Sequence, residues 1–93
     1  MLVDIVEVKS KNYFNLWLKF EDGTEGEVDI KRLLVEFTGV FSVLEDLKTF
    51  RAVRANPETG TIIWPGDIDL CQDVLYAAVK GLPKPNLDGT NVG

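Results

Sequence analysis

The clearest pattern in the chain is an alternation of apolar and polar positions over residues 13–20. One set of alternating positions holds Phe14, Leu16, Leu18 and Phe20, and the other holds Tyr13, Asn15, Trp17 and Lys19. Successive side chains of a strand point to opposite faces of its sheet, so a period of two predicts a β-strand with one face in the core. A second alternation over residues 24–30, with acids on its other face, predicts a second strand.

Register decides the loop between these two strands. A two-residue turn would place Phe20 opposite Glu25, which puts an acid on the apolar face. A three-residue loop over 21–23 places Leu16 opposite Val28, so that apolar residues share one face. A shift of one residue reverses a whole strand, so the pattern favours the longer loop. We predict that it is a type I turn followed by a left-handed glycine in a G1 bulge.

The first segment, residues 2–9, is rich in valine and isoleucine and predicts another strand. Its alternation changes phase between Ile5 and Val6, which indicates a β-bulge or a stretch covered on both faces. Residues 10–12 then form a short hairpin loop.

Beyond Asp29 the period of the pattern becomes helical. Leu33, Leu34 and Phe37 predict a short helix that ends at Gly39, and a further helical turn follows around 41–47. Strands are predicted over 50–55 and 61–64. Residues 56–60 form the loop between them, and Pro65-Gly66 stops the second strand beside a core tryptophan, Trp64.

The last predicted element is a helix over 72–80 with one apolar stripe, ended by Gly81. The predicted fold class is therefore α+β, in the order β-β-β-α-β-β-α. It has a small antiparallel sheet and helices packed mainly on one face. Residues 1–82 form a single domain, and 83–93 are expected to be a flexible C-terminal tail.

The net charge of the chain limits the classes of partner that we expect it to bind. The net charge is −5, with a pI of about 4.6 and no basic cluster, so direct binding of nucleic acid is disfavoured. No apolar run approaches the roughly 20 residues of a membrane-spanning helix, and the N-terminus is unlike a signal peptide. With a single cysteine, these features predict a cytoplasmic protein that does not bind membranes.

The 93 residues include no histidine, which removes the commonest general base and the commonest zinc ligand. Cys71 and the two serines therefore lack a base, and Cys71 is interpreted as a small buried residue beside the last helix. We expect no catalytic residue, no metal and no cofactor.

Three acids precede and begin the last helix, namely Asp67, Asp69 and Asp73. Clustered carboxylates can hold a divalent cation, but the spacing fails the calcium-loop pattern. The alternative interpretation is helix capping by Asp69 and Asp73, whose negative charge opposes the helix dipole.

Tyr13, Trp17 and Lys19 lie on the side of their strand opposite the apolar set. If helices cover only one face of the sheet, these side chains are exposed, and exposed aromatic residues often mark interfaces. The alternative is that another part of the chain covers them.

The order of several short motifs is similar to that of domain-of-unknown-function family 2442, a family of small bacterial domains. The matching segments are 18–23, 28–29, 41–50, 60–65 and 67–76. The resemblance implies a compact α+β fold without an established activity. It also implies an arrangement in which relatives are encoded beside another small protein, like toxin–antitoxin pairs. Relatives often have proline where Gln72 stands, at the first turn of the last helix.

Three hypotheses follow. The first is a protein-interaction module, an antitoxin-like or regulatory partner of a small protein encoded beside it. The second is a metal-dependent enzyme that uses Asp67, Asp69 and Asp73. The third is an accessory domain that homodimerises and has no chemistry of its own.

Overall fold

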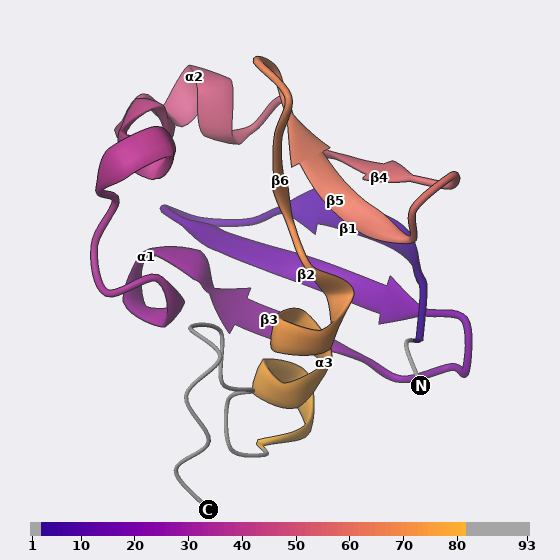
Figure 1. Ribbon diagram of the computed structural model, residues 1–93. Helices are drawn as coiled ribbons and strands as arrows, with labels where there is room; N and C mark the ends of the chain where they lie inside the picture. Colours follow the sequence, from indigo (N-terminus) through magenta and orange to yellow (C-terminus); the bar gives the residue numbers. More distant parts are fainter. Residues whose placement is uncertain (1–2, 82–93) are drawn as a thin grey trace, which may run out of the picture.

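A computed structural model describes residues 3–81 of the chain (Figure 1). The predicted tail, 83–93, lies outside the described residues. In chain order the elements are β1 (Ile5–Ser10), β2 (Asn15–Phe20), β3 (Glu25–Asp29), α1 (Ile30–Leu33), the 3-10 helix η1 (Gly39–Glu45), α2 (Leu47–Phe50), β4 (Arg54–Asn56), β5 (Thr61–Trp64), β6 (Ile68–Leu70) and α3 (Gln72–Lys80). The α+β class and the antiparallel pairing are confirmed.

The hairpin of β2 and β3 has the predicted register. Leu16 lies opposite Val28, and the backbone N–H of Phe20 donates to the carbonyl of Thr24 over 2.8 Å. Gly23 closes the three-residue loop with a φ of +90°, in the region that glycine adopts without strain. The side-chain pattern therefore predicted this register correctly, because only one register keeps the buried face apolar.

The predicted irregularity in the first strand is a bulge. The pairing of β1 with β2 shifts between Ile5 and Glu7, and Val6, at the bulge, is 54% exposed. An extra residue in one strand reverses the facing of the residues after it. The phase change in the sequence has this cause.

The segment between the sheets differs from prediction. α1 ends at Leu33 and does not reach Gly39, because Val35 and Glu36 adopt left-handed φ angles of 52° and 69°. The predicted strand over 50–55 is also wrong over residues 50–53, since Phe50 ends helix α2 and β4 begins at Arg54.

β5 and α3 have the predicted bounds, but the three-residue strand β6 between them was not predicted. β6 completes a second sheet, so the described chain has two three-stranded sheets, ordered β1-β2-β3 and β4-β5-β6. β1 runs beside β4 and β5 (Figure 1), and the N–H of Ile5 donates to the carbonyl of Gly60 over 2.9 Å.

The core lies between the two sheets and α3. Trp64 is 2% exposed, as predicted for a core tryptophan, and its Nε1–H donates to the backbone carbonyl of Phe50 over 2.9 Å. The ring of Phe50 packs against Trp64, with centroids 5.9 Å apart. The rings of Phe14 and Phe37 pack against Phe50 and against each other at centroid distances of 5.1–6.2 Å. The polar end of Trp64 is thus satisfied inside an aromatic cluster.

Candidate interaction surface

Trp17 occupies the middle of the face of the first sheet that points away from the core. It belongs to the central strand β2, between Lys9 on β1 and Glu27 on β3. The side chain is half-buried, and the ammonium of Lys9 lies 5.3 Å from the centroid of its ring. An exposed cation–π contact of this kind contributes only about 0.5–1 kcal/mol, so Lys9 is held weakly over the ring.

Lys19 lies on the same face, two residues after Trp17 in β2. Its cross-strand neighbours are Glu7 and Glu25, and Glu7 also forms an ion pair of 3.4 Å with Lys9. This sheet face therefore carries one aromatic ring among charges of both signs, which is typical of a polar interface rim around an aromatic anchor. We call Trp17, Lys19 and their cross-strand neighbours the outer face.

Tyr13 was predicted to lie on the outer face, and this prediction is wrong. Its φ of 57° takes it out of the strand, which begins at Asn15. Its ring instead packs edge-on against Phe14, with centroids 4.6 Å apart, and it is 60% exposed. The sequence pattern placed Tyr13 beside Trp17 because a period of two assumes an extended backbone at every position.

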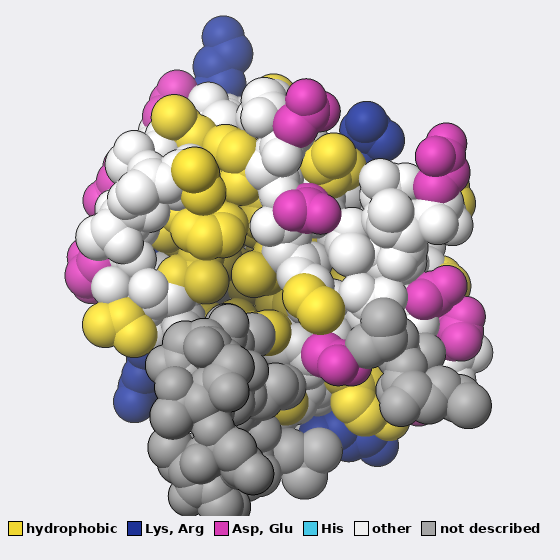
Figure 2. Space-filling model, viewed as in Figure 1, with side chains coloured by type: hydrophobic (Ala, Val, Ile, Leu, Met, Phe, Trp, Pro, Cys, Tyr) yellow, Lys and Arg dark blue, Asp and Glu magenta, His cyan; other side chains and the backbone are white. Residues whose placement is uncertain are grey.

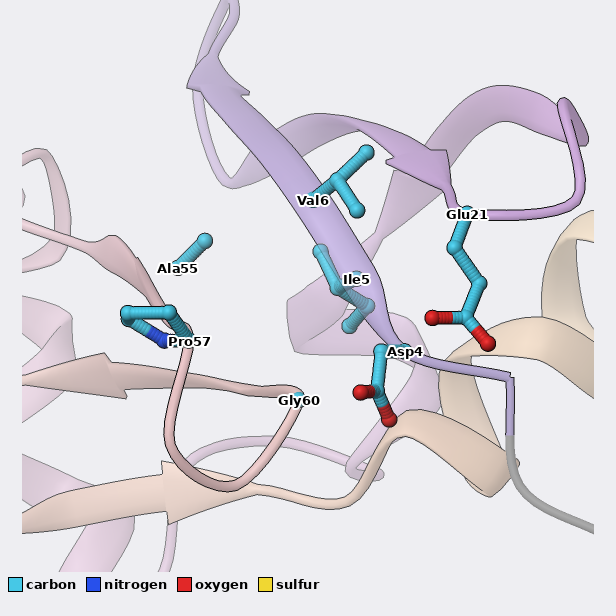
Figure 3. Close-up of a pocket in the computed structure, with 7 residues that line it drawn as sticks. All are labelled: Asp4, Ile5, Val6, Glu21, Ala55, Pro57 and Gly60. Carbon is cyan, nitrogen blue, oxygen red and sulfur yellow. The ribbon is translucent and has the colours of Figure 1, made fainter.

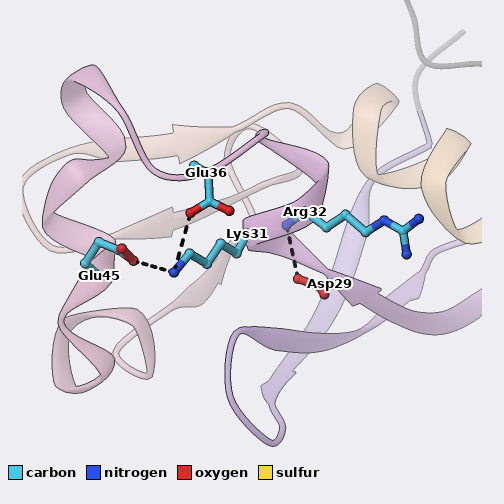
Figure 4. Close-up of polar contacts among 5 residues, drawn as sticks. All are labelled: Asp29, Lys31, Arg32, Glu36 and Glu45. Atoms are coloured by element: carbon cyan, nitrogen blue, oxygen red, sulfur yellow. Dashed lines mark hydrogen bonds and ion pairs between the residues drawn. The ribbon is translucent and has the colours of Figure 1, made fainter.

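Lys31 joins Tyr13 to the segment that follows. Its ammonium lies 5.8 Å from the centroid of the ring of Tyr13. The same ammonium forms ion pairs with Glu45 at 2.9 Å and Glu36 at 3.6 Å (Figure 4). The hydrogen bond to Glu45 raises the pKa of Lys31 above its ordinary value. These contacts tie α1 to η1, and the carboxylate of Asp29 caps α1 by accepting from the N–H of Arg32.

The three predicted carboxylates are on three different local structures. Asp67 is in the turn after β5, Asp69 is on β6, and Asp73 is in the first turn of α3. Across residues 3–81, no three acidic, cysteine or histidine side chains are grouped so that they could hold a metal ion. Capping by Asp69 is wrong, since the N-cap of α3 is Cys71, whereas Asp73 does lie at the positive end of the helix.

Cys71 is exposed, which corrects the expectation that it is buried. Its thiol contacts the Oε1 of Gln72 over 3.7 Å and makes no cap bond to the helix. Gln72 takes the buried place instead, at 2% exposed, and its Nε2 donates to Asp4 Oδ1 over 3.3 Å and to the carbonyl of Thr59 over 3.1 Å.

A shallow pocket lies where β1 meets β4 (Figure 3). Asp4, Val6 and Glu21 line one side of it, and Ala55, Pro57 and Gly60 line the other. The carboxylate of Asp4 lies so close to Gly60 that a Cβ on Gly60 would collide with it. Sequence patterns gave no signal for this contact, because it joins residues that are far apart in the chain.

A second hollow separates η1 from β6. Val40 and Phe41 line it from η1, and Gly66, Asp67, Ile68 and Asp69 line it from the turn and β6. Figure 2 shows hydrophobic side chains gathered in the hollow between these two segments, with acidic side chains along β6. The groove was not predicted, because it depends on the three-residue strand β6. We call it the η1–β6 groove.

The described residues form a small α+β domain of two antiparallel three-stranded sheets. The chain belongs to the family described as protein of unknown function (DUF2442), which matches residues 5–81. No curated protein and no solved structure matches the chain. No helix in the described part of the chain has the length and apolar character needed to cross a membrane.

Proposed function

We propose that this chain is a cytoplasmic protein-interaction module without catalytic chemistry of its own. In this proposal it acts as an antitoxin-like or regulatory partner of a small protein encoded beside it. The observation that carries the proposal is Trp17, a half-buried tryptophan at the centre of the outer face. Tryptophan is among the residues that contribute most to binding when a partner covers them.

The surroundings of Trp17 suit reversible binding. The ammonium of Lys9 lies over the ring, and its flexible stem lets it move aside when a partner arrives. Lys19, between two glutamates, gives the face alternating charge that can orient a partner. Tyr13 offers a second exposed ring, at the end of β2 that adjoins α1.

Co-expression with the product of the neighbouring gene tests this function. We expect the two proteins to elute together on gel filtration. We also expect this chain to protect cells from the activity of the neighbouring protein. Trp17→Thr, which keeps a β-forming residue in the strand, should weaken the complex at least about tenfold by calorimetry.

Two further variants locate the surface. Lys19→Gln removes the charge, and Tyr13→Asn removes the ring while keeping a residue that tolerates a left-handed backbone. Lys48→Gln, an exposed lysine on α2, is the matched control and should bind like the wild type. The proposal fails if no complex forms at roughly 100 μM protein, a concentration that detects even weak pairs. An unchanged affinity in a folded Trp17→Thr protein would remove the outer face from the interface.

A further inference from the structure

We propose that the η1–β6 groove binds an extended segment of a partner protein in which apolar and basic residues alternate. The groove is separate from the outer face and was not part of the function proposed above. The inference rests on three observations, namely an apolar hollow, an open strand edge and an unpaired acidic rim.

The hollow has the size and lining of a side-chain site. Its volume is about 490 Å³, and Val40, Phe41 and Ile68 supply its apolar surface. Val40 is 70% exposed, so apolar area remains open to water in the free protein. Figure 2 shows this hydrophobic hollow opening on the face that carries β6. Covering it would remove apolar surface from water, which favours binding.

β6 is the edge of the second sheet. Among the described residues it pairs with β5 alone, so its other side offers backbone groups to an incoming strand. Partner segments commonly bind by adding a strand to such an edge, where the main chain provides affinity and alternate side chains provide specificity.

The side chains on the two sides of β6 indicate which side chains an added partner strand should carry. Ile68 and Asp69 are successive residues of a strand, so they face opposite sides of the sheet. An added strand in the same sheet would therefore meet an apolar surface on one side and a carboxylate on the other. Alternating apolar and basic residues match this pattern.

The negative charge of the groove favours a basic partner segment over a second copy of this chain as the occupant. No lysine or arginine lines the groove, and no ion pair of Asp67 or Asp69 occurs within residues 3–81. Bringing a strand alongside would strip water from these carboxylates, and a cation on the partner compensates that cost. A second copy would bring the same carboxylates together, in a chain whose net charge is −5.

A peptide titration of the full-length chain tests the groove. The probe is a capped nine-residue peptide that alternates lysine and valine, and the matched probe replaces each lysine with glutamate. We expect the lysine peptide to shift the amide resonances of β6 and of Val40 and Phe41, and the glutamate peptide to shift none. Asp69→Lys and Val40→Asp should each weaken binding about tenfold. Glu58→Gln, which removes an exposed acid elsewhere, is the control.

Several results would overturn the inference. Equal binding of both peptides, or shifts confined to other elements, would show that the groove does not select a basic strand. Shifts of β6 with protein concentration alone would identify a second copy as the occupant. Shifts of residues 82–93 together with β6 would identify the chain's own C-terminal segment. Binding of the neighbouring protein stays measurable in each case, so failure here is distinct from failure of the proposed function.

Discussion

At the scale of single residues, two left-handed glycines have different surroundings. A Cβ on Gly23 would meet nothing within 4 Å, whereas one on Gly60 would collide with the carboxylate of Asp4. Both positions have positive φ, at 90° and 76°. The first glycine is therefore needed for its backbone alone, and the second also for the space that it leaves.

We predict that Gly23→Ala lowers the free energy of unfolding by about 1–2 kcal/mol, the cost of a left-handed alanine. Gly60→Ala should lower it by more, because the collision adds to the same strain. Urea denaturation measures both. Gly23→Asn is the control and should be milder, since asparagine tolerates this conformation. Equal losses for the two alanine variants would contradict the role given to Asp4.

Single residues also mark where sequence patterns fail. Tyr13 fits the period of its strand but turns out of it, and Cys71 is exposed while Gln72 beside it is buried. Gln72 is buried because Asp4 and Thr59 satisfy its amide. Neither partner could be predicted, because patterns along the chain carry no information about residues brought together by folding.

At the scale of elements, regular and extended stretches were predictable. The β2–β3 hairpin and α3 follow from periods of two and 3.6 over several residues, whereas the four-residue strand β5 follows from the loop before it and from Pro65-Gly66 after it. α1 and β6 are too short, at four and three residues, to show a period. The η1–β6 groove depends on β6, so it could not be predicted. The face of the sheet on which Trp17 and Lys19 lie could be predicted, since both belong to a regular strand.

The packing of α3 on β3 gives a prediction at this scale. A Cβ on Gly26 would lie 2.8 Å from Cγ1 of Val79, so α3 approaches the strand closely at that point. We predict that Gly26→Ala destabilises the protein by about 1–3 kcal/mol through overpacking. Val79→Ala, which removes that Cγ1, should cost less in the Gly26→Ala background than in the wild type.

Thermal or urea unfolding of the four proteins in this double-mutant cycle gives the coupling energy between the two sites. A coupling of zero would mean that helix and strand do not touch at this position.

At the scale of the whole molecule, a hydrogen bond connects the β2–β3 hairpin to the last helix. The hydroxyl of Tyr76 donates to Asp22 over 2.8 Å. The backbone N–H of Thr24 also donates to this carboxylate, over 2.9 Å. The bond from Thr24, followed by that from Tyr76, lowers the pKa of Asp22 below its ordinary value of 3.8.

A carboxylate whose pKa is lowered by folding stabilises the fold above its unfolded pKa and loses that contribution as the pH falls through the folded value. We predict that Asp22 titrates below 3.8 by NMR and that Tyr76→Phe raises its pKa toward that value. The variant should therefore lose less stability than the wild type on acidification below about pH 4. Tyr13→Phe is the control. An unchanged Asp22 titration in Tyr76→Phe would show that the bond is absent in solution.

The bond between Ile5 and Gly60 links the first sheet to a segment of the chain that is synthesised later. The first sheet is formed by residues 5–29, whose contacts are close in sequence and can form early. Its buried side is completed by Trp64 and Leu75, which a ribosome adds long after the first strands. The nascent chain therefore exposes an apolar sheet until the second sheet and α3 have been synthesised, and in that interval it is open to aggregation and to chaperones.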